Sequence, residues 1–468
     1  MQHLNGQPPS PHAAPSPNGR LPVAVIGAGP VGLAAAAHLL ERGLDPLILE
    51  AGQIGAGVAT WAHVRVFSPW RHNLDAAAVR LLTRSGWVAP DPDGYPTGTE
   101  LRERYLVPLA ATPELAPRLR LGSRVVAVTR HGLDKMKDAG REQAPFELIV
   151  DQYGRQEPLL ARAVIDASGT VATPNPLGAS GIPAPGEAQL AAAAQIAYGM
   201  PDVLTQPERY AGRRVLVVGS GHSAMQVLHD LVRLRAQAPA TEITWAIRRA
   251  DRAGLYRNDP DDPLPARAAL GAAAQRLITA GAVQLVTGVE IHQLRTTAEG
   301  VLVDHRTGRL GPVDQIVAAT GFRPDLSPLR ELRLRLDPGI EAPAALAPLI
   351  DPNVHSCNTV PLHGAVELAH PEPGFYLAGM KSYGRAPTFL MLTGYEQVRS
   401  IAAALAGDLE AARRVELVLP AGGACGTDAA ARGASCSAPD AVGAAPLACC
   451  GPEIVAVGER PAGRAAGR

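Results

Sequence analysis

Short apolar runs that are typical of buried strands alternate along the chain with longer segments whose apolar positions have helical spacing. The order strand, glycine-rich turn and helix occurs at Val23–Arg42 and returns at Val215–Val232. Between Arg124 and Arg162, apolar and polar positions alternate, which predicts a small β-meander. This pattern predicts an α/β fold with two Rossmann-like dinucleotide-binding domains.

Both ends of the chain lack this pattern. Residues 1–20 are rich in Pro, Ser, Asn and Gly, which predicts a disordered leader. Residues 420–468 are rich in Ala and Gly and contain no aromatic residue, so we expect a flexible tail there. The tail carries every cysteine except Cys357, namely Cys425, Cys436, Cys449 and Cys450.

The first glycine-rich turn has the spacing G-x-G-x-x-G, at Gly27, Gly29 and Gly32. In a dinucleotide-binding unit, these glycines permit the tight turn, the approach of a pyrophosphate and the close packing of helix on strand. The next apolar run ends on Glu50, whose carboxylate can accept hydrogen bonds from a ribose diol and would repel a 2′-phosphate. The alternative is a chance glycine turn. The position of the first turn, at the start of the ordered chain, favours FAD as its ligand.

The second turn repeats this arrangement with Gly219, Gly221 and Ala224. The strand that follows ends on Arg248 and Arg249, where the first unit ends on an acid. Because guanidinium groups bind phosphate, the exchange predicts NADPH rather than NADH, and the alternative is a pair of solvated surface arginines. The two turns therefore predict two cofactors, FAD and NADPH.

Two later motifs extend the pattern: Ala319-Thr320-Gly321 and the strand-like run that ends at Gly379. Together the motifs resemble those of the two-dinucleotide-binding-domain flavoproteins, and within them the single-component NADPH-dependent flavin monooxygenases. The segment 375–389 is similar to the flavoprotein monooxygenases of bacterial arsenic-resistance gene clusters. One departure is the segment 196–202, which lacks the histidine of the usual F-x-G-x-x-x-H fingerprint and argues against ordinary Baeyer–Villiger or amine-oxygenating activity.

The resemblance implies that the second domain is inserted in the first. We expect the leader at 1–20, an FAD-binding domain at 21–190 and 311–410, an NADPH-binding domain at 205–310, and the tail at 420–468. The expected cofactor-binding residues are Gly27, Gly29, Gly32, Glu50, Trp61, Thr320, Gly321, Gly379, Gly219, Gly221, Ser223, Ala224, Arg248 and Arg249.

The resemblance also implies the reaction: NADPH reduces FAD, and the reduced flavin passes one atom of dioxygen to a small soft nucleophile such as an arsenical. Two alternatives stay open, an NAD(P)H-dependent flavin reductase of a quinone or disulfide acceptor, and a non-enzymatic protein that binds flavin and metalloid. A disulfide reductase needs a redox-active cysteine pair beside the flavin, whereas Cys357 is the only cysteine before residue 420.

No catalytic residue can be assigned from the sequence. The substrate-side candidates, which follow the strands expected near the flavin, are Trp61, Arg65, Trp70, His72, Lys381 and Tyr383. The alternative roles are core packing for the tryptophans, a satisfied turn for His72 and a snorkelling surface side chain for Lys381.

No metal site is expected. The group His355, Cys357, His363, Glu367 and His370 matches no standard zinc spacing. The tail cysteines are hypothesised to bind a thiophilic metalloid such as trivalent arsenic, and the alternative is a low-complexity tail without a function.

Charge and hydropathy narrow the choice of partners. Lys+Arg and Asp+Glu are 44 each, a balance that argues against nucleic-acid or anionic-membrane binding. The apolar stretch Leu21–Leu40 could pass for a membrane span, but it contains the first glycine turn. We therefore expect a cytoplasmic protein whose partners are a small-molecule substrate and dioxygen, with no nucleic acid and no membrane, and with a homodimer left open.

Overall fold

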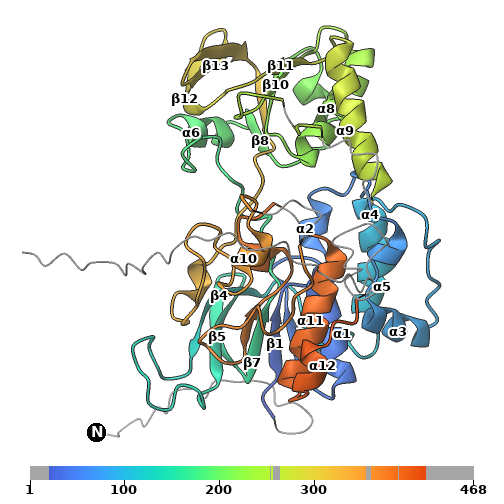
Figure 1. The fold of residues 1–468 in the computed structure, drawn as a ribbon, viewed down its shortest axis with the longest axis vertical. Helices are drawn as coiled ribbons and strands as arrows, with labels where there is room; N and C mark the ends of the chain where they lie inside the picture. The colour runs from blue at the N-terminus through green and yellow to red at the C-terminus, as the bar shows by residue number, and fades with distance from the viewer. Residues whose placement is uncertain (1–19, 253, 257–263, 355–359, 388, 418–468) are drawn as a thin grey trace, which may run out of the picture. The chain divides into compact units, whose positions relative to one another are not determined.

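The computed structural model describes residues 20–252, 254–256, 264–354, 360–387 and 389–417 (Figure 1). The expected leader, apart from residue 20, lies outside these residues, as do the tail 420–468 and its four cysteines. Strands and helices alternate along the chain, and the two larger sheets are parallel, so the expected α/β class is confirmed. Within the described ranges, no helix combines the length and hydropathy that a membrane span requires.

The first sheet is parallel and has the strand order β16-β7-β1-β2-β3. Its strands are β1 (Val23–Ile26), β2 (Pro46–Leu49), β3 (Leu119–Arg120), β7 (Ala163–Asp166) and β16 (Phe375–Leu377). Three of them, β1, β7 and β16, come from segments far apart in the sequence. The sheet therefore brings the first glycine turn, which follows β1, next to the residues that follow β7 and β16.

Helix α1 (Pro30–Glu41) follows the first turn and is buried along most of its length. It contacts α11 (Met391–Leu405) and α3 (Ala76–Arg84). Gly43 ends the helix: it has a φ of +68°, and the next residue, Leu44, donates its N–H to the carbonyl of Leu39 at 2.9 Å. Only glycine adopts this left-handed conformation without strain.

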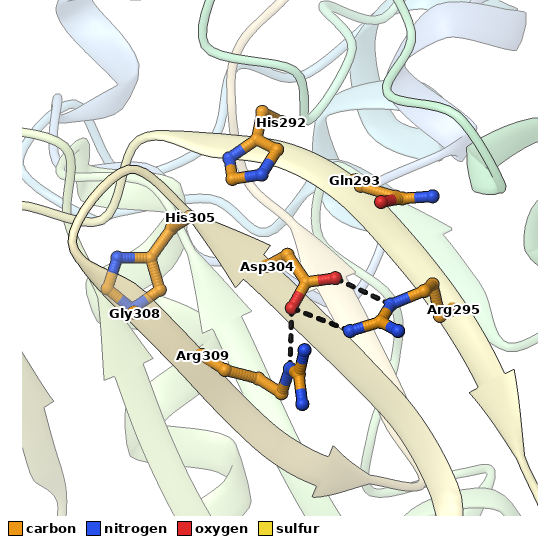
Figure 2. A pocket seen from close by; sticks show the side chains of 7 residues that line it. All are labelled: His292, Gln293, Arg295, Asp304, His305, Gly308 and Arg309. Carbon is orange, nitrogen blue, oxygen red and sulfur yellow. Dashed lines mark hydrogen bonds and ion pairs between the residues drawn. The ribbon is translucent and has the colours of Figure 1, made fainter.

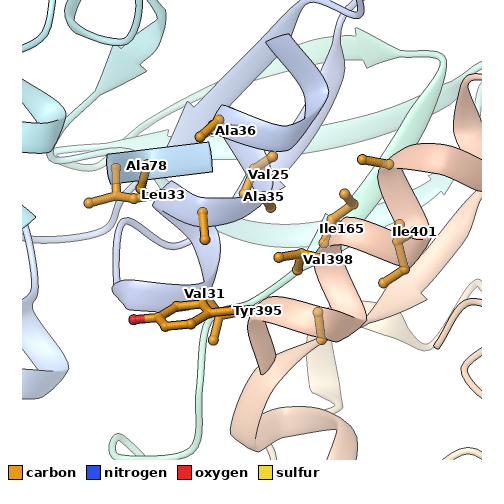
Figure 3. Packing of buried hydrophobic residues seen from close by; sticks show 14 of the residues in the cluster. Val25, Val31, Leu33, Ala35, Ala36, Ala78, Ile165, Tyr395, Val398 and Ile401 are labelled. Carbon is orange, nitrogen blue, oxygen red and sulfur yellow. The ribbon is translucent and has the colours of Figure 1, made fainter. Parts of the chain in front are cut away.

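Side chains of β1 alternate between two apolar clusters on opposite faces of the first sheet. Val23 and Val25 pack in a cluster with α1 and α11, whereas Ala24 and Ile26 pack with the meander strands. Figure 3 shows Val25 and the α11 side chain Val398 in the first of these clusters. Burial on both faces explains why β1 is an uninterrupted apolar run rather than an alternating one.

The second sheet is also parallel, with the order β11-β10-β9-β15-β8. Its strands are β8 (Ile196–Tyr198), β9 (Arg214–Val218), β10 (Glu242–Ala246), β11 (Gln284–Val286) and β15 (Gln315–Ala318), and its long helices are α8 (His222–Gln237) and α9 (Pro265–Thr279). The expected NADPH range, 205–310, excludes both β8 and β15, yet these strands pair in this sheet. The expected range is too narrow for this sheet, because pairing between strands that are distant in the sequence is not encoded in a local pattern.

Two antiparallel meanders accompany the sheets. The expected one is confirmed as β4 (Arg124–Arg130), β5 (Phe146–Gln152) and β6 (Arg155–Ala161). A second, which the sequence analysis did not predict, consists of β12 (Ile291–Thr297), β13 (Gly300–His305) and β14 (Gly308–Val313). Charged residues on the solvent-exposed face of this meander interrupt the alternation of apolar and polar positions, so the strands have no clear pattern in the sequence.

The remaining elements are short and lie in the connections. They are the α-helices α2 (Ala56–Ala59), α4 (Gly98–Leu101), α5 (Val107–Ala110), α6 (Glu187–Ala192), α7 (Pro207–Tyr210), α10 (Ala347–Ile350) and α12 (Leu409–Arg413), the π-helix η2 (Arg102–Leu106), and the 3-10 helices η1 (Trp70–His72), η3 (Ala116–Arg118), η4 (Ser327–Leu329) and η5 (Gly379–Tyr383).

A buried carboxylate, Glu372, ties three segments together beside the first meander. It accepts hydrogen bonds from Arg130 Nε at 2.7 Å, from Arg141 Nη2 at 2.7 Å and from the backbone N–H of Arg333 at 3.0 Å. Burial raises the pKa of Glu372, but the hydrogen bonds from Arg141 and Arg130 outweigh it, so the pKa lies below its usual value. The acid is therefore held ionised in the interior.

Candidate functional site

The first glycine turn is closed tightly at two of its three glycines. Gly27 has a φ of +102°, and a Cβ there would lie 2.8 Å from the carbonyl oxygen of Ala167. A Cβ on Gly32 would lie 2.0 Å from the carbonyl oxygen of Gly27. A Cβ on Gly29, in contrast, would meet nothing within 4 Å. The turn therefore leaves open space at the middle glycine, where α1 begins and a phosphate group fits.

Glu50 lies at the end of β2 and is fixed against this turn. Its Oε2 accepts the N–H of Ala28 at 2.7 Å, and its Oε1 accepts the N–H of Gly52 at 2.8 Å. Two backbone donors orient the carboxylate, and each oxygen keeps a further lone pair that can accept a hydrogen bond. The residues at this turn thus fit the diphosphate and ribose of FAD.

The second turn has the same construction. Gly219 has a φ of +133°, and a Cβ there would lie 2.2 Å from the carbonyl oxygen of Ala319. Trp245 Nε1 donates to the carbonyl of Gly219 at 2.6 Å. A Cβ on Gly221 would meet nothing within 4 Å, and Ala224 is fully buried. The second turn is therefore also open at its middle glycine.

The other residues predicted to bind NADPH lie near this second turn, after the end of β10 and in α8. The N–H of Gly219 bonds the carbonyl of Ala246, the last residue of β10, and Arg248 and Arg249 follow two and three residues later, both exposed. Ser223 lies half-buried in the first turn of α8. The arginines are thus placed at the carboxyl end of β10, where a 2′-phosphate would be recognised.

Thr320 and Gly321 lie where the chain leaves β15. Thr320 Oγ1 donates to the carbonyl of Asn175 at 2.6 Å, and the N–H of Asn175 donates to the carbonyl of Gly321 at 2.9 Å. Arg323 Nε donates to the side-chain oxygen of Asn175 at 2.9 Å. The segments around Asn175 and around Thr320 are therefore hydrogen-bonded to each other.

Lys381 is buried rather than exposed, so the snorkelling alternative is wrong. Its side chain is 3% exposed, and its Nζ donates to Asp166 Oδ2 at 2.7 Å and to Ser168 Oγ at 3.0 Å. Asp166 Oδ1 accepts from Ser168 Oγ at 2.6 Å. Asp166 ends β7, and the residue after it, Ala167, supplies the carbonyl against Gly27. This buried ion pair therefore lies one residue from the carbonyl group that contacts Gly27 of the first turn.

The segment η5, which carries Lys381, is also held against the start of α1. Gly379 has a φ of +67°, and a Cβ there would lie 3.2 Å from the side chain of Val31. Tyr383, at the end of η5, is 2% exposed, and its ring centroid lies 5.2 Å from that of Phe389 and 5.5 Å from that of His363. Tyr383 thus packs in the interior.

The candidates between residues 61 and 72 have different surroundings. Trp70 is 3% exposed, with Arg104 placed 5.8 Å from its ring centroid, so it is part of the core. Trp61 is half-buried and packs against the same core cluster. Arg65 is exposed, donates to the carbonyl of Tyr95 and lies 3.7 Å from the carboxylate of Glu100.

His72 is half-buried in η1, and burial together with the nearby Arg71 lowers its pKa. Within the described residues, no polar contact of Arg65 or His72 reaches Lys381. The structure therefore brings Lys381 and Tyr383 together in η5.

Comparison with known proteins identifies the family. The family model described as pyridine nucleotide-disulphide oxidoreductase matches residues 21–355. The chain belongs to this family. Membership implies FAD and NAD(P)H as cofactors and an oxidoreductase activity, which confirms the expected cofactor classes.

Curated relatives of the chain include enzymes of two kinds. A ferredoxin–NADP reductase of Salinispora tropica is 31% identical over 320 residues, which cover 67% of this chain and 78% of the relative. An indole-3-pyruvate monooxygenase of Oryza sativa subsp. japonica is 32% identical over 219 residues, which cover 45% of this chain and 44% of the relative. The chain thus spans less than half the length of that monooxygenase.

Solved structures share the fold at low identity. The bacillithiol disulfide reductase of Bacillus cereus has a TM-score of 0.62 and 19% identity, with 83% of this chain and 99% of that chain covered. A flavin monooxygenase from Stenotrophomonas maltophilia has a TM-score of 0.53 and 21% identity, with 83% and 98% covered. Both likenesses establish the shared architecture.

Sequence reasoning missed several polar residues of this oxidoreductase that lie at the first turn. Asp166, Ser168 and Gln397 are not among the residues that the sequence analysis expects at a site. One signal could have singled out Asp166: it is a charged residue at the end of the otherwise apolar β7, and all four residues of that strand are buried. A buried acid requires a partner, and the chain offers few lysines.

The described residues around His363 are held by contacts within the protein. Among the described residues, no group of three His, Cys, Asp or Glu is arranged to hold a metal ion. His363 contacts Pro361 and Gln397, Glu367 accepts the N–H of Gly364, and His370 accepts the N–H of Arg335. His355 and Cys357 lie outside the described residues.

A surface depression lies on the second meander, away from both glycine turns in the sequence (Figure 2). It is lined by His292, Gln293, Arg295, Asp304, His305, Gly308 and Arg309. Asp304 accepts hydrogen bonds from Arg295 Nε at 2.6 Å and from Arg309 Nε at 2.5 Å, which lower its pKa to about 2. Each arginine is thus paired with the central acid, and the depression contains none of the expected cofactor contacts.

Proposed function

We propose that this protein is an NADPH-dependent FAD monooxygenase that acts on a small soft-nucleophile substrate, with arsenicals as the substrate class to test first. The observation that carries the proposal is the presence of two open glycine turns with opposite charges at the following strand ends. Glu50 at the first turn suits the ribose of FAD, and Arg248 and Arg249 at the second suit the 2′-phosphate of NADPH. The sequence similarity of residues 375–389 to arsenic-resistance flavoproteins supports the substrate class.

The chain's own residues would bind and orient the two cofactors. The open space at Gly29 and the N-terminus of α1 would receive the FAD diphosphate, while the buried pair of Lys381 and Asp166 would fix the η5 segment beside it. When bound, FAD would supply the redox chemistry toward dioxygen, with NADPH as the source of electrons. The protein's part is to position the two cofactors and to exclude water.

The cysteine content supports a monooxygenase over a disulfide reductase. A flavin-dependent disulfide reductase of the C-x-x-C type needs two cysteines beside the flavin. In this sequence, Cys357 stands alone before residue 420.

A second candidate function is an NADPH-dependent reductase of another electron acceptor. It is favoured by the Salinispora tropica ferredoxin–NADP reductase, whose sequence the chain matches over 78% of its length. Such an enzyme would pass electrons from the flavin to its acceptor without incorporating an oxygen atom.

Rapid mixing would distinguish the two functions. The FAD-loaded protein is reduced anaerobically with NADPH and then mixed with oxygenated buffer, with and without arsenite or an organic arsenical. For a monooxygenase we expect an absorbance phase between reduced and oxidised flavin whose decay is accelerated by substrate, together with an oxygenated product. Direct return to oxidised flavin, with fast electron transfer to a quinone or ferredoxin, would establish the reductase. Failure of NADPH to reduce the flavin would refute both.

A further inference from the structure

A closed hydrogen-bond network surrounds Gly379 in η5. The N–H of Gly379 donates to Gln397 Oε1 at 2.8 Å, and the carbonyl of Gly379 accepts from Ser382 Oγ at 2.8 Å. Gln397 Nε2 lies 3.0 Å from Ser382 Oγ and 2.9 Å from His363 Nε2. His363 Nδ1 lies 3.0 Å from the carbonyl oxygen of Pro361. These side chains are buried, so each polar atom depends on its partner in the network.

The donors and acceptors of this network have one consistent assignment. A backbone N–H only donates, so the atom of Gln397 that faces Gly379 must be its oxygen, and the amide nitrogen must face His363 and Ser382. A carbonyl only accepts, so His363 Nδ1 must carry a proton toward Pro361. His363 Nε2 then has to accept a hydrogen bond from the Gln397 amide. The network is complete only when His363 is the neutral, Nδ1-protonated tautomer.

The network determines where η5 lies relative to the first glycine turn. Gly379 packs on Val31, two residues after the middle glycine of that turn, and Lys381 binds Asp166 on the neighbouring β7. If the Gln397 amide rotated, its NH₂ group would face the N–H of Gly379, and two donors would oppose each other. Gly379 would then lose a buried hydrogen bond at the position where η5 meets the start of α1.

We propose that Gln397 and His363 are positioning residues for FAD: neutral His363 fixes the orientation of the Gln397 amide, which holds Gly379 against the first turn, so FAD binds tightly only while His363 is neutral. Protonation would place an N–H of His363 against the NH₂ group of Gln397 and would favour the rotated amide. The inference rests on FAD binding, which family membership implies, and holds whether the enzyme is a monooxygenase or a reductase.

The surroundings of His363 favour its neutral form. Burial lowers its pKa, and the Pro361 carbonyl and the Glu367 carboxylate oppose this effect only partly. The Tyr383 ring centroid lies 5.5 Å from that of His363, and the ammonium group of Lys381, two residues before Tyr383 in η5, is paired with Asp166. Because FAD binding would require the neutral form, protonation competes with FAD, and affinity falls as the pH drops through the pKa of His363 in the apoprotein.

The test measures the dissociation constant of FAD for the full-length apoprotein, by quenching of flavin fluorescence, from about pH 8 to about pH 4. For the unsubstituted protein, we expect the constant to rise as the pH falls, by at most about tenfold per pH unit for one linked proton. His363→Gln places an amide oxygen near the position of Nε2 and cannot titrate, so its affinity should be nearly independent of pH in this range. Gln397→Leu removes the hydrogen bonds that connect His363 with Gly379 and should weaken FAD binding by about tenfold at every pH.

Two results would overturn the inference. One is an FAD affinity of the unsubstituted protein that does not change with pH, and the other is a His363→Gln variant with the same pH dependence as the unsubstituted protein. Thermal unfolding of each apoprotein separates a loss of folding from a loss of positioning. Even if Gln397→Leu fails to fold, the comparison of His363→Gln with the unsubstituted protein decides the question.

Discussion

The buried pair of Lys381 and Asp166 leads to a quantitative prediction about stability. Replacing Lys381 with Met removes the ammonium group but keeps a side chain of similar length. Asp166 would then be 2% exposed with Ser168 as its remaining side-chain partner. Removal of one partner from a buried ion pair costs about 3–5 kcal/mol, because the other charge is left uncompensated. Since Ser168 still donates to Asp166, we expect the lower end, about 3 kcal/mol.

Chemical denaturation of the apoprotein, followed by circular dichroism, measures this loss in the free energy of unfolding. Lys135→Met is the matched control, because Lys135 is exposed and its Nζ donates to a backbone carbonyl at 3.1 Å. The control should change the free energy by less than about 0.5 kcal/mol. The double variant Lys381→Met with Asp166→Asn removes both charges and should recover part of the loss.

The reasoning would be refuted if Lys381→Met were no more destabilising than Lys135→Met. It would equally be refuted if the double variant were less stable by the full sum of the two single changes, because additive effects would mean that the two charges do not interact. A loss of FAD binding by Lys381→Met without a loss of stability would instead show that the pair acts on the cofactor alone.

Three further outcomes follow from the described contacts. Gly219→Ala should abolish reduction of the flavin by NADPH while FAD content is retained, because its Cβ would lie 2.2 Å from a backbone oxygen. The control Gly308→Ala lies in the second meander, where a Cβ would come no nearer than 3.8 Å to another residue, and stopped-flow reduction rates compare the two variants. The double change Arg248→Ala and Arg249→Ala should raise the KM for NADPH by at least about tenfold and leave that for NADH nearly unchanged, and equal losses for both nucleotides would contradict 2′-phosphate recognition. Glu372 has a lowered pKa, so its stabilisation is present above its unfolded value of about 4.5 and disappears as the pH falls through its folded pKa; Glu372→Gln should be less stable at pH 7 and should lose this acid-dependent change in an unfolding titration.

The sequence was sufficient to predict the two nucleotide-binding turns because their constraints are local. Gly27 and Gly219 need a positive φ, and this requirement is met within a strand, a turn and a helix, whereas their close backbone neighbours, Ala167 and Ala319, come from distant segments. The ends of the following strands, Glu50 in one case and Arg248 in the other, are equally local. The α/β class and the first meander were predictable from periodicity for the same reason.

The sequence was insufficient where pairing joins distant segments. Whether β15 belongs to the first or the second sheet depends on its neighbours, β8 and β9, and not on its own residues. Lys381 and Asp166 are 215 residues apart, so their pairing had no local signal, and the sequence left a site residue and a surface side chain open as roles for Lys381. A sequence can single out a buried acid such as Asp166, but the role of that acid follows only once its partner is known.

The non-local contacts converge on one short segment, and this convergence explains why η5 is built from small and polar residues. Gly379 must be glycine to face Val31 with a positive φ, Lys381 must reach Asp166, and Ser382 must serve both Gly379 and Gln397. Each contact fixes η5 to a different element: α1, β7 and α11. An isolated hydrogen bond would add only about 1 kcal/mol, but three anchors on different elements leave η5 a single position relative to the first turn. We therefore expect substitutions in this segment to change FAD affinity more than substitutions at the half-buried Trp61, whose contacts are with the apolar core.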